Sequence, residues 1–131
     1  MFKGEDLKFG FKQEDKLFPK ICNKFGDDLI KTDQMCRWDY ESNTVLIELK
    51  SRRNKKNTYP TTMIGKQKVD LMMESGKRVI SMFKFTDGLY YIEVTKDNIC
   101  KFLTQVGGRS DRGVDEVNIY YYIPVEMLSL L

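Results

Sequence analysis

One hydrophobic segment of the chain ends in two ionisable residues. Residues 44–49 read Thr-Val-Leu-Ile-Glu-Leu, and Lys50 follows them. A short run of β-branched and apolar residues is typical of a strand that is at least half buried. Because side chains alternate between the two faces of a strand, Glu48 and Lys50 share one face, with Leu46 behind them. The chain must therefore build a sheet that covers this strand and still places both charged groups at its end.

The register of a hairpin decides where a second carboxylate points. Residues 41–43 are polar and separate this strand from residues 37–40, which are predicted to form the first strand of a hairpin. If residues 42–43 form the loop, Asp39 pairs with Leu46, diagonal to Glu48. If residues 43–44 form it, Asp39 pairs directly with Glu48. In both registers the carboxylates share a face, within about 5–8 Å at Cβ. A three-residue loop would put Asp39 on the other face.

Two carboxylates and a lysine at a strand end suit a divalent metal ion. Magnesium is a hard cation that takes oxygen ligands, and it usually needs only one or two carboxylates besides water and substrate phosphate. The alternative is a solvent-facing strand end with an ion pair, which contributes about 0–1 kcal/mol. We favour the metal site because either two-residue loop puts Asp39 on the same face of the hairpin as Glu48, and because a basic loop follows Lys50.

Asp39 followed by Glu48-Leu49-Lys50 at the end of a hydrophobic strand resembles the PD-(D/E)xK nuclease motif. Trp38 stands at the motif's nominal Pro, which is a mild departure because that Pro is often absent. The resemblance covers roughly residues 10–95. It implies an α/β, restriction-endonuclease-like fold in which a central mixed β-sheet is flanked by helices, with an αβββαβ core.

The resemblance also implies a Mg²⁺-dependent endonuclease that hydrolyses phosphodiester bonds in DNA. Asp39 and Glu48 would hold Mg²⁺ together with the backbone carbonyl of Leu49, and Mn²⁺ would substitute for Mg²⁺. The ion would polarise the scissile phosphate and lower the pKa of a water molecule. Lys50 would orient that water or stabilise charge on the phosphate.

Two predicted helices supply further catalytic candidates. Residues 10–14 resemble a segment of Holliday-junction resolvases, which makes Glu14 a candidate; the alternative is a solvated glutamate at a helix start. Family members often carry a Lys or Gln on the second helix, facing the site. We favour Gln67 over Lys66 for that position, and the alternative is an ordinary polar helix face.

Basic residues follow the catalytic strand directly. Phosphate contacts supply most non-specific affinity for nucleic acid, although a run of this kind is more often a solvated loop. Residues 120–122 are three tyrosines that reach both faces of a strand, so core packing is favoured and base stacking is the alternative. The predicted nucleic-acid-binding residues are Arg52, Arg53, Lys55, Lys56 and Lys66.

Composition excludes several kinds of chemistry. The chain has no histidine, which excludes catalytic triads and metal sites that depend on it. Cys22, Cys36 and Cys100 lack the short spacing of a zinc site, and an odd number of cysteines is a poor disulfide framework. We expect three buried thiols in a reducing compartment. The net charge of +3 is too weak to indicate nucleic acid by itself.

Length and hydropathy favour one compact unit. A chain of 131 residues predicts a single nuclease domain over residues 1–131. No apolar run reaches the length of a membrane span, and the N-terminus lacks a signal-peptide core. We therefore expect a soluble intracellular protein of the cytoplasm or nucleus with no membrane partner. Its size suits a homodimer.

Periodicity and turn residues predict the order of elements. Pro19 either begins the first helix or kinks it, and Gly26 ends it. The second helix opens at residues 59–62, where Pro60 fits a first turn, and Gly76 ends it. The expected helices are residues 13–25, 59–76 and 97–103, and the expected strands are residues 27–31, 35–40, 44–49, 78–85, 89–95 and 117–125.

Several readings of function remain open. A junction resolvase, a small restriction nuclease and a repair nuclease all fit the pattern, and RNA is a further substrate. The competing class is a catalytically inactive nucleic-acid-binding or subunit-assembly module with the same fold. Metal-dependent cleavage distinguishes the nuclease from that module, and salt-dependent binding distinguishes a nucleic-acid partner from an assembly role.

Overall fold

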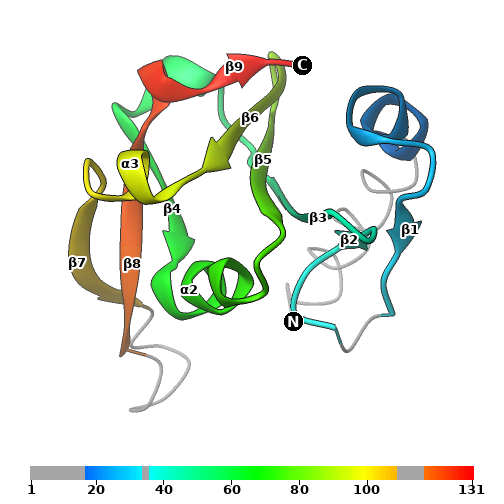
Figure 1. Ribbon diagram of the computed structural model, residues 1–131. Helices are drawn as coiled ribbons and strands as arrows, with labels where there is room; N and C mark the ends of the chain where they lie inside the picture. The colour runs from blue at the N-terminus through cyan, green and yellow to red at the C-terminus, as the bar shows by residue number, and fades with distance from the viewer. Residues whose placement is uncertain (1–16, 34–35, 109–116) are drawn as a thin grey trace.

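The computed structural model describes residues 17–33, 36–108 and 117–131, which form two β-sheets and a few helices (Figure 1). The larger sheet has six strands in the order β1-β2-β3-β5-β6-β9. They are β1 (Ile30–Lys31), β2 (Tyr40–Glu41), β3 (Val45–Ser51), β5 (Arg78–Phe85), β6 (Gly88–Val94) and β9 (Ser129–Leu130).

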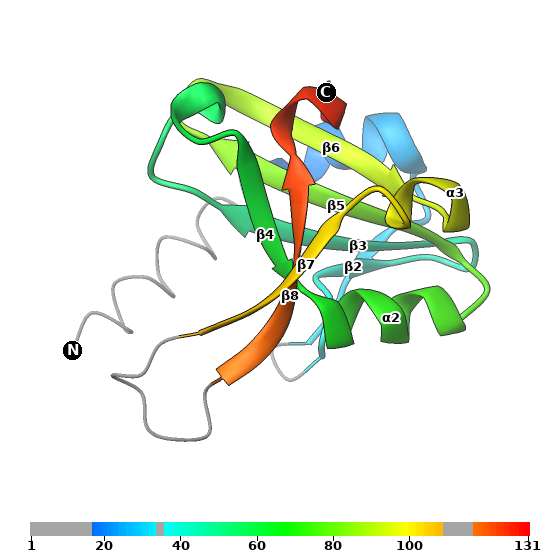
Figure 2. The same cartoon turned by 90° about the vertical axis from the view of Figure 1, so that its left-hand side faces the viewer.

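The second sheet is antiparallel, in the order β4-β8-β7, and its strands run across those of the first sheet (Figure 2). They are β4 (Thr61–Gly65), β7 (Leu103–Gly108) and β8 (Val117–Pro124). Residues 17–25 are helical. The other helices are α2 (Lys66–Glu74), the short α3 (Lys96–Ile99), and the 3₁₀ turns η1 (Lys56–Thr58) and η3 (Val125–Met127).

The larger sheet is mixed. Strand β3 runs parallel to β5, whereas the other neighbouring strands pair antiparallel. Parallel strands need a crossover connection, and here β4 and α2 provide it. The helix at residues 17–25, the strands β1 to β3, the helix α2 and strand β5 reproduce the expected αβββαβ order. The prediction of an α/β, restriction-endonuclease-like fold is confirmed.

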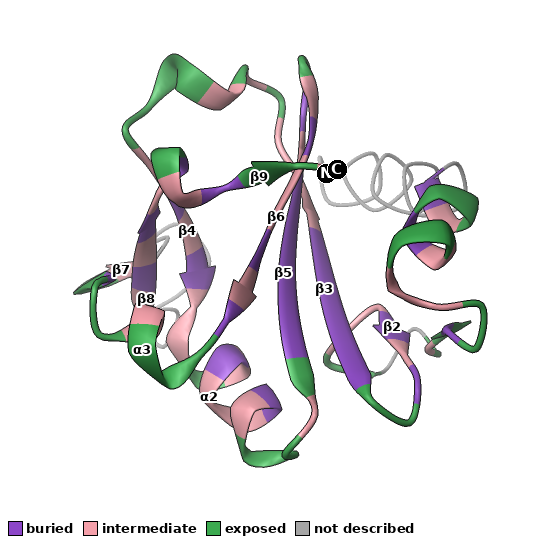
Figure 3. Cartoon of the chain, turned by 45° about the horizontal axis from the view of Figure 1, so that its top comes forward, coloured by how far each residue is buried: buried purple, intermediate pink, exposed green. Residues whose placement is uncertain are grey.

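Strand β3 is buried on both faces, as Figure 3 shows. On one face, Leu46 and Val79 pack toward α2 and the second sheet. On the other face, Ile47 and Ile80 pack with Leu17 and its neighbours on the helix at residues 17–25. The sheet is thus the middle of three layers. Glu48 lies two residues after Leu46, so its side chain points into the layer formed by α2 and the second sheet.

The expected start of the second helix was wrong. Residues 61–65 form strand β4, in which Thr62 and Ile64 are buried and alternate with more exposed neighbours. The β-branched side chains of this segment favour a pleated surface, and all five residues pair with β8. The helix α2 therefore begins at Lys66, and Gly76, with φ of 77°, follows it as expected.

Some of the other expected elements were confirmed and some were wrong. The expected strands at residues 27–31 and 35–40 are reduced to β1 and β2 in the described residues, and residues 36–39 are not in a strand. Gly26 ends the first helix, because its N–H donates to the Cys22 carbonyl at 2.8 Å and its φ is 129°. Strand β5 has the expected bounds. Strands β7 and β9 were not predicted, and Leu103 begins β7 instead of ending a helix. Glu14 lies outside the described residues, so its expected role is untested.

The expected burial of the three thiols was wrong. Cys36 and Cys100 are exposed, and Cys22 is half-buried.

Candidate active site

The hairpin adopts the second of the two expected registers. Tyr40 pairs with Ile47, and the Ser42 N–H donates to the Val45 carbonyl at 2.9 Å, so residues 43–44 form the loop. Regular pairing ends at Tyr40, because the Asp39 N–H donates to the carbonyl of Ile47, the partner of Tyr40, at 2.9 Å. The negative charge of Asp39 nonetheless acts on Glu48, so the two carboxylates are neighbours.

Glu48 is buried and lies between two lysines. Its side chain is only 4% exposed. Lys50 Nζ lies 3.3 Å from Glu48 Oε1, and Lys68 Nζ lies 3.3 Å from both carboxylate oxygens. Lys50 comes from the same strand, whereas Lys68 comes from the first turn of α2. The crossover helix thus carries a cation to the carboxylate.

One oxygen of this carboxylate has no hydrogen bond. Glu48 Oε2 is buried and lacks a hydrogen-bond partner within the described part of the chain, so its contact with Lys68 is one of charge. Ser81 pairs with Glu48 across the parallel ladder, and its buried Oγ also lacks a partner among those residues. Buried polar atoms are normally satisfied, so each such atom needs an explanation.

The backbone of strand β3 orients Asp39. The Leu49 N–H donates to Asp39 Oδ2 at 2.7 Å. This bond continues the hairpin with a side chain in place of a backbone carbonyl, because strand β2 begins only at Tyr40. Asp39 is half-buried and is therefore closer to solvent than Glu48. The hydrogen bond limits how its carboxylate can rotate.

Burial raises the pKa of Glu48 above its ordinary value. Lys50 and Lys68 oppose this shift in pKa, and the negative charge of Asp39 adds to it. Desolvation is the largest cause, so the folded chain holds this carboxylate at a free-energy cost. A strongly perturbed carboxylate with charged neighbours is typical of functional sites.

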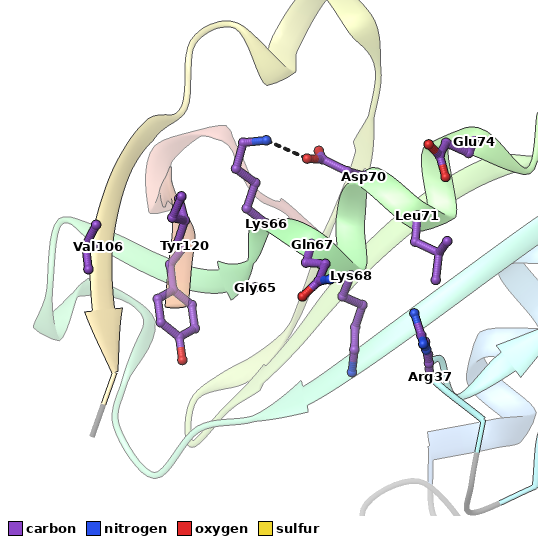
Figure 4. Close-up of a pocket in the computed structure, with 11 residues that line it drawn as sticks. Arg37, Gly65, Lys66, Gln67, Lys68, Asp70, Leu71, Glu74, Val106 and Tyr120 are labelled. Atoms are coloured by element: carbon purple, nitrogen blue, oxygen red, sulfur yellow. Dashed lines mark hydrogen bonds and ion pairs between the residues drawn. The ribbon is translucent and has the colours of Figure 1, made fainter. Parts of the chain in front are cut away.

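The helix residue that reaches Glu48 is Lys68. Lys66 instead extends toward Asp70 and forms an ion pair with it (Figure 4). Gln67 is exposed and lies beside Lys68 in an open pocket. Sequence reasoning missed Lys68, although it precedes the buried Met72 by four residues and so lies above it on the same helix face.

The basic residues after β3 have different surroundings. Arg52 donates to the Met63 carbonyl at 2.7 Å and lies 5.6 Å from the Phe83 ring centroid, so it ties the end of β3 to β4. Burial lowers the pKa of Arg52. Lys56 Nζ lies 5.0 Å from the Tyr90 ring centroid. Arg53 and Lys55 are exposed.

An open groove of about 1060 Å³ adjoins the carboxylates. Lys50 and Lys68, which flank Glu48, both line it. The pocket beside it has a volume of about 910 Å³ and includes Arg37. The two hollows share Gly65, Lys68 and Tyr120. A ligand in the groove would therefore reach the charged cluster directly.

The carboxylates fit a metal ion that needs few protein ligands. No group of three or more His, Cys, Asp or Glu side chains gathers anywhere in the described residues. Asp39 and Glu48 nonetheless match the one or two carboxylates that Mg²⁺ usually takes. The unsatisfied Glu48 Oε2 is an oxygen whose missing partner a cation would supply.

The sequence matches the model of a family described as "Phage putative PDDEXK endonuclease" over residues 21–129. The chain belongs to this family. A PDDEXK endonuclease carries the pattern in which Asp39, Glu48 and Lys50 were recognised, so the resemblance to the PD-(D/E)xK superfamily is confirmed. Membership implies nuclease activity, and nucleases of this kind generally use divalent metals.

The curated proteins include no significant match to the chain. Among the helices that the structure describes, none is both long enough and apolar enough to cross a membrane.

Proposed function

We propose that the chain is a Mg²⁺-dependent endonuclease that hydrolyses phosphodiester bonds in DNA, with Asp39 and Glu48 as metal ligands. Mn²⁺ would replace Mg²⁺. The observation that carries the proposal is Glu48 Oε2, a buried oxygen without a hydrogen bond, in a carboxylate that has the charged Asp39 as a neighbour. The free-energy cost of burying this carboxylate is offset when a cation binds it.

Each residue of the cluster has a distinct part in this proposal. Asp39 and Glu48 hold the ion, with the Leu49 carbonyl as a further ligand, and the Leu49 N–H fixes one Asp39 oxygen. When bound, the ion supplies positive charge to the phosphoryl oxygens and acidifies a water molecule. Lys50 stabilises negative charge that develops on the phosphate.

Lys68 takes the part that the sequence assigned to Gln67. Its ammonium lies against Glu48 in the resting chain and lines the groove where substrate would lie. Once an ion neutralises the carboxylate, Lys68 can turn to a phosphate oxygen. Gln67 stays at the rim of the neighbouring pocket, where it can contact substrate. Phosphate contacts by Arg53, Lys55, Lys56 and Lys66 would supply non-specific affinity.

A cleavage assay tests the proposal. Duplex, single-stranded, flap and four-way-junction DNA are incubated with the chain in Mg²⁺, in Mn²⁺ and in chelator. Glu48→Gln and Lys50→Ala are compared with Lys96→Ala, an exposed lysine on α3 outside both hollows. We expect cleavage by the wild type and by Lys96→Ala only. Cleavage that persists in chelator or in Glu48→Gln would overturn the proposal.

A homodimer is the assembly that we propose for this nuclease, because the compact size of a 131-residue chain suits a dimeric, structure-selective endonuclease. Light scattering of the purified chain with and without four-way-junction DNA tests it. A mass of one chain under both conditions would contradict it.

A further inference from the structure

The three consecutive tyrosines of β8 point to opposite sides of the second sheet. Tyr121 is 5% exposed and packs on Phe102, with ring centroids 5.8 Å apart. Tyr120 and Tyr122 lie on the other face, and both line the groove that adjoins the carboxylates. Core packing explains why Tyr121 is aromatic. It does not explain why Tyr120 and Tyr122 are.

Two glycines lie near Tyr120 on the groove side of the sheet, although Gln105 is its direct partner on β7. Gly65 pairs with it on β4, and a Cβ built on Gly65 would meet nothing within 4 Å. On the other side, a Cβ on Gly107 would come within 3.0 Å of the Tyr120 ring and 3.2 Å of the Tyr122 hydroxyl. The rings therefore lie close over one glycine, and the space above the other glycine is open. Tyr120 presents a ring beside unfilled space.

The charges of the groove fit a polyanion. Among the described residues that line it, none is acidic. Lysines extend along its wall from the catalytic strand, from η1 and from α2, and an arginine lies between them. These cations are Lys50, Arg52, Lys56 and Lys68. The neighbouring pocket differs, because Asp70 and Glu74 line it.

Aromatic rings beside cations favour a single strand over a duplex as the ligand of this groove. A phosphodiester backbone can follow the lysines in either case. Only unpaired bases expose a face that can stack on a tyrosine, and such stacking tolerates any base sequence. Tyr59, which is 61% exposed, lines the same groove at its far end, so aromatic rings recur along it.

We infer that this tyrosine-faced groove binds a single-stranded segment of DNA, with Tyr120 and Tyr122 stacking on unpaired bases and placing the adjoining phosphate at Asp39 and Glu48. The inference rests on the proposed nuclease function and names its substrate class. Flaps, gaps and single-stranded tails offer such a segment, whereas a continuous duplex does not. Lys50 and Lys68 belong to both the groove and the cluster, which joins binding to cleavage.

Equilibrium binding in chelator tests the inference without cleavage. Fluorescence anisotropy is measured with a labelled single strand of about ten nucleotides, which is within the usual site size, and with a duplex of the same sequence. Tyr120→Ala and Tyr122→Ala are expected to weaken single-strand binding by about 5- to 100-fold each. Tyr120→Phe and Tyr122→Phe are expected to bind as the wild type does, because the ring stacks and the hydroxyl does not.

Gly65→Leu provides a second test that keeps the tyrosines. Gly65 has φ of −59°, which any residue adopts, and its side-chain space is open. A leucine there would occupy the space beside Tyr120 and should weaken single-strand binding to a similar extent. Thermal melts of each variant show whether it is folded. Folded variants that bind the single strand as tightly as the wild type would overturn the inference, as would equal losses for single strand and duplex.

Different results would refute the nuclease proposal and the single-strand groove. Binding in chelator does not depend on hydrolysis, so Glu48→Gln should retain tyrosine-dependent affinity for the single strand. Tyrosine-dependent binding without Mg²⁺-dependent cleavage of any DNA would refute the nuclease proposal alone. Cleavage that requires Glu48 but is unaffected by removing the tyrosine rings would refute the single-strand groove alone.

Discussion

Lys68 Nζ on helix α2 lies 3.3 Å from both carboxylate oxygens of Glu48 on strand β3. The crossover between the two parallel strands brings them together, because β4 and α2 connect β3 to β5. A buried carboxylate and a lysine from the crossover helix therefore share one small space beside the groove. In the resting chain the lysine offsets part of the cost of burying the carboxylate.

Replacing Glu48 by Gln should stabilise the metal-free fold at neutral pH. Burial raises the pKa of Glu48, and each unit of elevation corresponds to about 1.4 kcal/mol. Since the folded pKa is above the unfolded one, the contribution of Glu48 to stability is full at acidic pH. It is lost as pH rises through the folded pKa. Glutamine is neutral throughout, so Glu48→Gln should have the higher free energy of unfolding at pH 7.

Urea denaturation of both proteins in chelator measures this difference. The two free energies of unfolding should converge as pH falls below the unfolded pKa of glutamate, about 4.3. Adding Mg²⁺ should stabilise the wild type by mass action and leave Glu48→Gln unchanged. A variant that is less stable than the wild type at pH 7 in chelator would show that the lysines hold the ionised carboxylate favourably.

Lys68→Ala should lower the rate of DNA cleavage by about 100-fold, as expected when one preorganised cation is removed from a phosphoryl-transfer site. Lys96→Ala is the control, because Lys96 is exposed on α3 and lies outside both hollows. Steady-state cleavage rates under saturating Mg²⁺ compare the two variants. Equal rates in both would remove Lys68 from the site.

Asp39→Asn separates the charge of Asp39 from its structural hydrogen bond. An asparagine oxygen can still accept from the Leu49 N–H, whereas Asp39→Ala loses that bond at a cost of about 1 kcal/mol. We expect Asp39→Asn to melt near the wild type and Asp39→Ala to melt earlier. Both should cleave DNA no faster than the wild type does in chelator. Substantial cleavage by Asp39→Asn would show that the carboxylate charge is not needed.

Arg52→Ala should reduce the free energy of unfolding by about 2 kcal/mol. Its partly buried guanidinium donates to the Met63 carbonyl and lies over the Phe83 ring, so its loss leaves a carbonyl unpaired and a gap between the sheets. Arg53→Ala, at an exposed neighbour, is the control and should change stability little. Urea denaturation measures both. An equal, small effect for the two variants would contradict the linking role of Arg52.

Local pattern was enough to predict the strand that carries Glu48 and the choice between two hairpin loops. Because side chains alternate along a strand, the register depended only on which two residues formed the loop. The parallel pairing of β3 with β5 agrees with the motif's fold, because a helix between two strands provides a crossover. These features depend on residues that are near one another in sequence.

The missed features depend on contacts between distant segments. Thr61–Gly65 became a strand because β8, more than fifty residues later, pairs with it. The helix residue facing the site was sought only between Lys66 and Gln67, so Lys68 was not considered, because its contact with Glu48 depends on how α2 packs on β3. Strand β7 has exposed residues such as Val106 and lacks a clear alternation, so only its pairing with β8 identifies it.

The most direct test of the proposed site is Mg²⁺ binding by isothermal titration calorimetry, using the wild type, Glu48→Gln and Asp39→Asn in the absence of DNA. Glu93→Gln is a matched control, because Glu93 pairs with Arg78 at the sheet surface. The proposed site predicts that the wild type and Glu93→Gln bind Mg²⁺ with the same affinity and that both site variants lose this binding. Unchanged Mg²⁺ affinity in Glu48→Gln and Asp39→Asn would contradict it.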